Sequence, residues 1–202
     1  MVADPKKRAA EKAHLVLIDE TGLLLNPLVR RTLAPRGETP LLIVPGAHRK
    51  RTSVIAALSL SPVTHQPGLY FQSLVNDYYN NVATSDFVRD LLRHLRGPVI
   101  LVWDNGNNHK GAPITKLLAD YPRLTIERLP PYAPDLNPVE QLWQHLKVGH
   151  LANYAAPDIQ TLDDKAVDFL ATAKFDRERL LSCFKNTPLY KPLTGHRLPG
   201  SQ

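Results

Sequence analysis

The sequence predicts an α/β fold in which a sheet containing parallel strands is flanked by helices. Two observations support this class. Short apolar runs rich in β-branched residues have the length of buried strands, and they alternate with segments whose apolar residues recur every three or four positions. The predicted order is three strands, a helix, a strand, a helix, a strand and a helix, which is typical of an α/β domain.

The strands are predicted from apolar runs that end at turn-forming residues. The first run is His14–Ile18, and a turn-rich segment from Ser61 to Pro67 separates the second and third strands. Between the first two strands, prolines predict a loop from Arg30 to Gly37 and short edge pieces from Thr39 to Pro45. The other predicted strands are Thr52–Leu60, Gly68–Val75, Val99–Trp103 and Leu124–Leu129.

Helices are predicted where an apolar stripe is bounded by capping residues. The helix Ser85–Arg96 is expected to have Thr84 or Ser85 as its N-cap and to stop at Gly97. The stripe of Ile114, Leu117 and Leu118 predicts a second helix. This second helix is predicted over 113–121. Further helices are predicted from 161 onward and over 175–184.

The segment Tyr132-Ala-Pro-Asp-Leu-Asn-Pro-Val-Glu-Gln-Leu-Trp143 places one acid at a defined position on a new helix. Pro134 and Pro138 predict an extended approach, Asn137 is a good N-cap, and Glu140 is the third helical residue. Trp143 belongs to the apolar stripe and is expected in the core, with Glu140 at the edge of that stripe. Glu140 therefore either faces a cleft or closes a capping box with Asn137.

Two further acids follow apolar runs at the predicted ends of strands. Asp19 follows His14–Ile18 and Asp104 follows Val99–Trp103, and turn-forming residues come after both acids. Ligand sites of parallel sheets gather at the carboxyl ends of the strands. A single strand-end Asp is usually a turn or helix cap, but two of them together with Glu140 predict a site.

Four segments together carry a family resemblance. Ile18-Asp-Glu-Thr21, Arg31-Thr-Leu-Ala-Pro-Arg-Gly37, Trp103-Asp-Asn-Gly-Asn-Asn-His109 and the segment ending at Trp143 resemble, in order and content, the catalytic domain of Tc/mariner-type DDE transposases. The bacterial insertion-sequence branch is the most similar. Residues 14–160 carry the resemblance, and the spacing of Asp104 and Glu140 agrees with that group. Leu33 departs from the pattern, since an aromatic residue is common there.

This resemblance implies a ribonuclease H-like fold, with a mixed five-stranded sheet flanked by helices, and a catalytic triad of Asp19, Asp104 and Glu140. The triad would bind two Mg²⁺ (or Mn²⁺) ions, with Asp19 bridging both ions. Hard cations of this kind prefer carboxylate oxygens, and two of them support in-line displacement at a phosphodiester. The implied function is DNA cleavage and strand transfer during transposition of an insertion sequence. The implied partners are double-stranded DNA and a second copy of the chain.

Residues near the triad are secondary candidates. Asn105 and His109 match the family pattern and would steady Asp104 or touch the substrate, with a polar turn as the alternative. Glu20 is next to Asp19, and neighbouring strand residues face opposite sides, so a salt-bridge or surface role is expected.

Basic residues are candidates for contacts with DNA phosphates. The chain has 25 Lys and Arg against 19 Asp and Glu, a formal charge of +6 that suits a polyanionic partner. The candidate contacts are Arg31 and Arg36, which flank a proline turn, and Arg49, Lys50 and Arg51, for which a solvated hairpin turn is the alternative.

Composition and length limit the remaining possibilities. The 202 residues predict a charged leader (1–13), a catalytic domain (14–160) and a C-terminal helical extension with a tail (161–202). A single Cys183 fits a reducing cytoplasm, and no apolar run reaches the ~18 residues that cross a membrane.

Only 13 residues precede the first predicted strand, which leaves no room for the helix-turn-helix region that relatives carry. Recognition of specific DNA ends is therefore expected to need a separately encoded helix-turn-helix polypeptide. A non-catalytic remnant that binds DNA or a full-length transposase and modulates it is the alternative function. Retention of all three acids favours the enzyme, because a remnant has no physical need for them.

Overall fold

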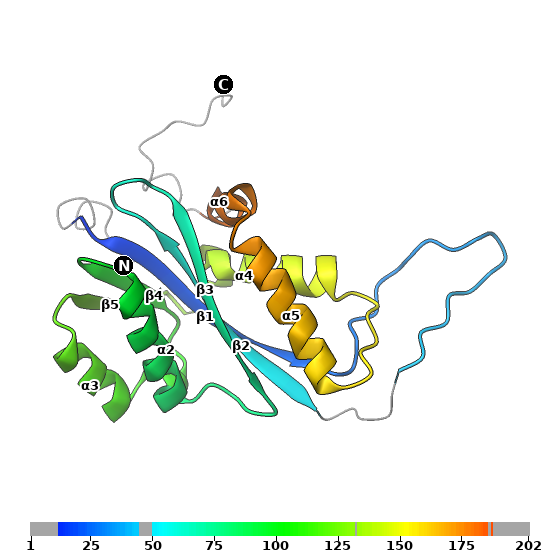
Figure 1. Cartoon of the computed structure of the whole chain (residues 1–202), viewed down its shortest axis with the longest axis horizontal. Helices are drawn as coiled ribbons and strands as arrows, with labels where there is room; N and C mark the ends of the chain where they lie inside the picture. The colour runs from blue at the N-terminus through cyan, green and yellow to red at the C-terminus, as the bar shows by residue number, and fades with distance from the viewer. Residues whose placement is uncertain (1–11, 45–49, 132, 186, 188–202) are drawn as a thin grey trace, which may run out of the picture.

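The computed structural model of the chain describes residues 12–44, 50–131, 133–185 and 187. A mixed sheet of five strands crosses the molecule in the order β3-β2-β1-β4-β5 (Figure 1). β1 is antiparallel to β2 and parallel to β4, so the sheet changes from antiparallel to parallel at β1. The strands are β1 (His14–Leu24), β2 (Arg51–Leu60), β3 (Pro67–Val75), β4 (Val99–Trp103) and β5 (Leu124–Arg128).

Each face of the sheet is covered by its own helices and has its own core. On one face Leu15 and Leu17 of β1 join the core with helices α4 (Pro138–Gln144), α5 (Ile159–Ala173) and α6 (Arg177–Lys185). On the other face Val16 and Ile18 pack with helices α2 (Asn81–His94) and α3 (Ala112–Asp120). Alternate residues of a strand point to opposite faces, so one fully buried apolar run supplies both cores.

β1 is longer than the sequence predicted. Asp19 was expected at the end of a strand that stopped at Ile18, but β1 continues to Leu24 and pairs with β2 from Leu15 to Leu24. The Glu-Thr-Gly sequence after Asp19 is therefore strand and not turn. Pairing with β2 supplies hydrogen-bond partners for the backbone N–H and C=O groups of this segment. This tertiary pairing outweighs the turn propensity of its residues.

Helix α2 begins four residues earlier than predicted. Asn80 is the N-cap, and its side chain accepts hydrogen bonds from the backbone N–H groups of Val82 and Ala83. Thr84 and Ser85, which were predicted as caps, lie inside the helix and are buried. The first N–H groups of a helix have no partner within the helix, and an Asn side chain accepts hydrogen bonds from them at least as well as Ser or Thr. Asn80 is therefore a favourable cap for the earlier start.

The approach to α4 also differs from the prediction. Pro134 and Pro138 were expected to hold an extended segment, but Pro134–Leu136 forms a 3-10 turn. Asn137 is the N-cap of α4 as predicted, accepting a hydrogen bond from Val139 N–H. After Gln144 the helix continues as a π-helical turn from His145 to His150.

The C-terminal helices pack on the face that α4 covers. α5 begins at Ile159 with Asp158 as its N-cap, close to the predicted start at Thr161, and α6 begins at Arg177. Both helices contribute to the core that contains Leu15 and Leu17. Buried Asp163 on α5 accepts hydrogen bonds from Thr52 on β2 and Ser73 on β3, which fixes this helix to the sheet.

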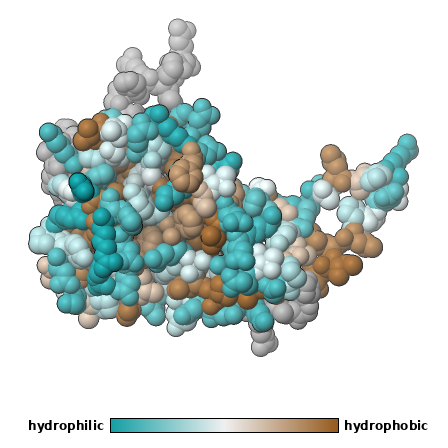
Figure 2. Space-filling view, viewed as in Figure 1, coloured by the Kyte–Doolittle hydropathy of each residue, from teal (hydrophilic) through white to brown (hydrophobic). Residues whose placement is uncertain are grey.

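A long loop of residues 25–44 leaves the body between β1 and β2 and projects away from it (Figures 1 and 2). The short edge pieces predicted from Thr39 to Pro45 are absent from the described residues 39–44, which form no strand. The base of the loop is held by Asn153, whose side chain bonds both backbone groups of Arg30. Among the described helices none is long and apolar enough to span a membrane.

Candidate active site

The sheet register brings two of the predicted acids to neighbouring positions. The parallel pairing of β1 with β4 has Leu17 beside Val102 as its last pair. Two residues further along each chain come Asp19 and Asp104, at the point where β4 ends and β1 continues. Asp19 thus lies in the middle of its strand but at the carboxyl end of the parallel part of the sheet, where ligand sites gather.

Asp19 is the more enclosed of these two acids. Its side chain points to the face that α4 covers, and Trp143 of α4 donates its indole N–H to Asp19 Oδ2 at 2.8 Å. Burial, and next the negative charge of Glu140, raise the pKa of Asp19 to about 7, although the bond from Trp143 acts in the opposite direction. The free energy of an ionised Asp19 is therefore high unless a positive charge enters the pocket.

Asp104 is exposed and is positioned by hydrogen bonds. Its side chain is 61% accessible, yet Oδ1 accepts a bond from Gly106 N–H at 2.7 Å and lies 2.7 Å from His109 Nδ1. A Cβ at position 106 would meet Asn108 Oδ1 at 2.5 Å and Asp104 Oδ1 at 2.9 Å, so a larger residue there would displace these side chains. Arg128 of β5 donates to the carbonyl oxygens of Asp104 and His109 and holds the loop to the sheet.

Glu140 is placed by the cap of its own helix. Asn137 is buried, and besides capping α4 it donates its amide to the carbonyl oxygen of Ile18, directly before Asp19. This bond ties the first turn of α4 to β1. In the described part of the chain Glu140 makes no capping bond back to Asn137, and its side chain lines a pocket.

One pocket of about 380 Å³ receives all three acids from three separate elements: β1, the loop after β4 and α4. Together with them it is lined by Asn105, Gly106, Leu129, Pro130, Pro131, Ala133 and Asn137. No three His, Cys, Asp or Glu side chains in the described residues are close enough to coordinate a single ion. Mg²⁺ needs less from the protein, because it commonly takes one or two carboxylates and completes its shell with water and phosphate oxygens. The carboxylates that line this pocket are therefore oxygen donors of the kind that hard divalent cations prefer.

The two polar residues predicted near Asp104 lie at different places. Asn105 lines the pocket and donates its amide to the carbonyl oxygen of Leu129 at 3.2 Å. His109 is buried, with 1% of its side chain accessible, and is stacked on Trp103 with ring centroids 4.4 Å apart. Burial alone would lower the pKa of His109, but the carboxylates of Glu20 and Asp104 outweigh it and raise that pKa.

Glu20 lies on the opposite face of β1 from Asp19, as its position in the strand predicted. Its carboxylate is 3.0 Å from His109 Nε2, so it is the acid of an ion pair and not a pocket residue.

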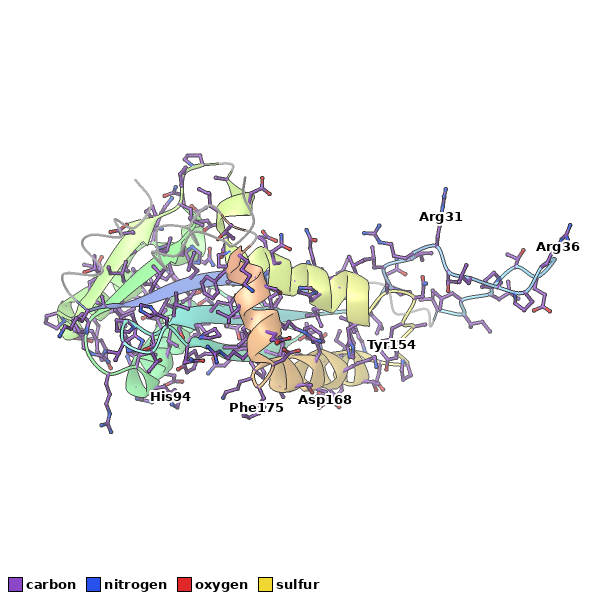
Figure 3. The ribbon with its side chains drawn as sticks, turned by 90° about the horizontal axis from the view of Figure 1, so that it is seen from above. Arg31, Arg36, His94, Tyr154, Asp168 and Phe175 are labelled. Carbon is purple, nitrogen blue, oxygen red and sulfur yellow. The ribbon has the colours of Figure 1, made fainter. Side chains whose placement is uncertain are left out.

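The predicted basic residues are separated from the pocket. Arg31 and Arg36 lie on the projecting loop, and their exposed side chains point away from the body (Figure 3). Arg51 is the first residue of β2, Lys50 directly precedes it, and both are exposed. Arg49 lies outside the described residues.

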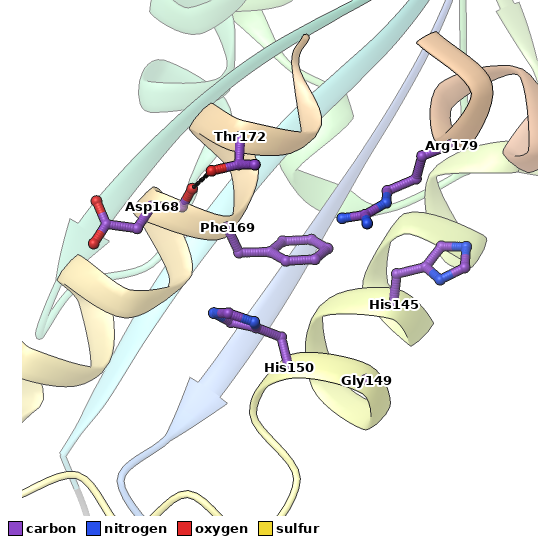
Figure 4. Close-up of a pocket in the computed structure, with 7 residues that line it drawn as sticks. All are labelled: His145, Gly149, His150, Asp168, Phe169, Thr172 and Arg179. Carbon is purple, nitrogen blue, oxygen red and sulfur yellow. Dashed lines mark hydrogen bonds between the residues drawn. The ribbon is translucent and has the colours of Figure 1, made fainter. Parts of the chain in front are cut away.

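A second cavity of about 350 Å³ lies between the end of the π-helical turn, α5 and α6 (Figure 4). Phe169 forms its floor, with the His150 ring 5.1 Å away and the Arg179 guanidinium over the Phe169 ring. Burial, and then the charges of Lys165 and Arg179, lower the pKa of His150. This cavity contains none of the three acids.

Two contacts of the site were not predicted from the sequence. Trp143 was assigned to the core, and it is 2% exposed, but its N–H also reaches Asp19. The position of Trp143 in an apolar stripe gives no sign of this bond. The pairing of Glu20 with His109 joins residues 89 positions apart, which spacing in a single sequence cannot indicate.

Comparisons with known proteins agree with this fold. The model of the family described as DDE superfamily endonuclease matches residues 14–163. The structure of the Mos1 transposase paired-end complex with left transposon end is similar, with a TM-score of 0.64 and 19% identity over 94% of this chain and 57% of that chain. The Mos1 strand transfer complex gives 0.64 and 21% identity over 94% of this chain and 56% of that one.

The isolated catalytic domain of Mos1 mariner transposase is also similar, with a TM-score of 0.57 and 15% identity, over 95% of this chain and 87% of that domain. This chain therefore spans a little over half of the Mos1 chains in those complexes but most of the isolated catalytic domain. A comparison with curated protein sequences gives no match.

Proposed function

The chain belongs to the DDE superfamily of endonucleases, and we propose that it is a transposase catalytic domain that cleaves DNA and transfers strands during transposition of an insertion sequence. The observation that carries the proposal is the convergence of Asp19, Asp104 and Glu140 on one pocket from three elements. The raised pKa of Asp19 supports it, because a pocket that disfavours its own negative charge is suited to binding cations.

We propose that Asp19, Asp104 and Glu140 would hold two Mg²⁺ or Mn²⁺ ions in this pocket. Structures of Mos1 complexes with Mn and with Mg are among those similar to this chain, which supports divalent ions of this kind. When bound, such ions activate a water or 3′-hydroxyl nucleophile and stabilise the leaving oxygen.

The protein's own side chains position the reacting groups. Trp143 fixes Asp19 on one side of the pocket, while Gly106 and His109 fix Asp104 on the other. Asn105 is bonded to Leu129 and lines the pocket, where it would contact the substrate. Holding the carboxylates in place before the substrate arrives lowers the cost of reaching the reactive geometry.

The proposed partners are double-stranded DNA, namely the element's ends and the target, and a second copy of the chain on that DNA. Arg31, Arg36, Lys50 and Arg51 are exposed and suited to backbone phosphates, which give affinity without sequence preference. Arg49 is included on sequence grounds alone. The described residues form a catalytic fold, and we propose that a helix-turn-helix polypeptide reads the specific end sequences.

A plasmid-nicking assay tests this function. The wild-type chain should convert supercoiled plasmid to open circles in Mn²⁺ and not in EDTA, and Asp104→Ala should lower the rate by orders of magnitude. Asp120→Ala, at the exposed end of α3, is the matched control and should nick at the wild-type rate. Equal nicking by wild type and Asp104→Ala would refute the catalytic assignment. DNA binding without any metal-dependent nicking would favour the non-catalytic alternative.

A further inference from the structure

Glu20 is an acid close to the proposed catalytic residues, and the proposed chemistry gives it no role. It follows Asp19 on β1 but faces the opposite side of the sheet, where Val16 and Ile18 pack. It does not line the pocket of the three acids, and 19% of its side chain is accessible. Burying part of a carboxylate costs free energy unless its charge is paired, so a partner for Glu20 is expected.

The partner of Glu20 is the His109 ring, and each of the two ring nitrogens contacts a carboxylate. His109 Nε2 lies 3.0 Å from Glu20 Oε1, and Nδ1 of the same ring lies 2.7 Å from Asp104 Oδ1. The ring is parallel to Trp103 within 2°, and it is buried. Glu20 and Asp104 are therefore connected through one imidazole that has no space to rotate.

Asp104 depends on such contacts because packing does not fix it. Its side chain is mostly exposed, so hydrogen bonds decide which way its carboxylate points. In the described part of the chain these bonds, from Gly106 N–H and His109, are made to Oδ1. Oδ2 is left with its lone pairs available to a ligand in the pocket.

We propose that Glu20 is a positioning residue for Asp104: it fixes the His109 ring, and the ring holds the Asp104 carboxylate toward the pocket. This inference rests on the proposed function of the pocket as a divalent-cation site. Residues that orient a metal ligand in this way commonly change metal affinity by ~10- to 100-fold when they are replaced.

Thermal unfolding during a Mn²⁺ titration tests the inference without relying on catalysis. A cation that binds the folded chain raises its melting temperature, and the Mn²⁺ concentration giving half of that rise reports affinity. Glu20→Gln keeps the shape of the side chain and removes its charge. We expect its half-point to lie about 10-fold above that of the wild type, with the same change in the Mn²⁺ dependence of nicking.

Two further variants separate positioning from other effects. Asp163→Asn removes the charge of another acid, which anchors α5 through Thr52 and Ser73, so it should lower the melting temperature but leave the Mn²⁺ half-point unchanged. His109→Phe keeps an aromatic ring against Trp103 but loses both nitrogens. In that background Glu20→Gln should have no additional effect, because the path to Asp104 is already broken.

The outcomes distinguish this inference from the proposed function. A wild-type half-point in Glu20→Gln, or an undiminished effect of Glu20→Gln in the His109→Phe background, would overturn the positioning role while the metal site stands. A wild-type chain that neither responds to Mn²⁺ nor nicks DNA would overturn both.

Discussion

The indole of Trp143 and the carboxylate of Asp19 are joined by a hydrogen bond of 2.8 Å between a core residue of α4 and a strand residue 124 positions earlier. The ring itself is buried on the face that contains Leu15 and Leu17. Packing of the ring therefore sets the position of the N–H, and the N–H sets the orientation of Asp19. Stability of this core and geometry of the pocket are coupled through one side chain.

Trp143→Phe should separate these two contributions. The variant keeps a large aromatic ring in the core but loses the N–H, so we expect a stability cost of about 1 to 2 kcal/mol and a clear loss of Mn²⁺-dependent nicking. Trp143→Ala should instead cost about 3 to 5 kcal/mol, because it leaves a cavity. Urea unfolding and the nicking assay measure the two effects. Full activity in Trp143→Phe would show that the bond to Asp19 does not matter for the reaction.

Asp19 should make the metal-free chain less stable as pH rises. Its folded pKa of about 7 lies above its ordinary value of 3.8, so the folded state keeps the proton at a pH where the unfolded state has lost it. Stability in EDTA should therefore fall between about pH 4 and pH 7, by at most about 4 kcal/mol.

Asp19→Asn has no carboxyl group to titrate and should remove this pH dependence. We expect its melting temperature in EDTA at pH 7 to equal or exceed that of the wild type, while its nicking falls by orders of magnitude. Melting curves from pH 4 to pH 8 in EDTA provide the measurement. Parallel pH profiles for wild type and variant would contradict the assigned pKa.

Asn137 should matter to stability through two bonds that can be separated. Asn137→Ala removes the cap of α4 and leaves the buried Ile18 carbonyl unpaired, so we expect a cost of about 2 to 3 kcal/mol. Asn137→Ser keeps an N-cap acceptor and loses the amide that donates to the Ile18 carbonyl. Urea denaturation should place Asn137→Ser between the wild type and Asn137→Ala; equal stability of all three would show that neither bond contributes.

Arg31 and Arg36 should contribute to DNA affinity without sequence preference. Replacing either with Gln should weaken binding to unrelated duplexes to the same extent. It should also make the plot of log affinity against log salt shallower, reducing the magnitude of its slope by about one. Arg93→Gln is the matched control, since Arg93 is exposed on α2 and paired with Asp90. Gel-shift titrations at several salt concentrations give the slopes. Unchanged slopes in both loop variants would exclude phosphate contacts by the projecting loop.

Much of the fold is determined by local patterns in the sequence. The strand Val99–Trp103 has the predicted bounds because a run of five apolar residues, three of them β-branched, between Pro98 and Asp104 is typical of a buried strand. Asn137 caps α4 because an Asn before Pro at the first helical position is favoured by the backbone itself. The three acids were singled out from local residue order and the family resemblance, and their catalytic role stays a prediction.

Tertiary structure decided where those acids meet and what holds them. Asp19 lies within a long strand and not at its end, because hydrogen bonds to β2 extend β1 past its own turn-forming residues. The bonds from Trp143 to Asp19 and from Glu20 to His109 join residues 124 and 89 positions apart. Local sequence fixes backbone preference over a few residues, whereas such contacts arise only when the sheet register and the packing of α4 bring distant segments together. Local sequence places the three acids along the chain, and tertiary contacts decide how their carboxylates are held at the pocket.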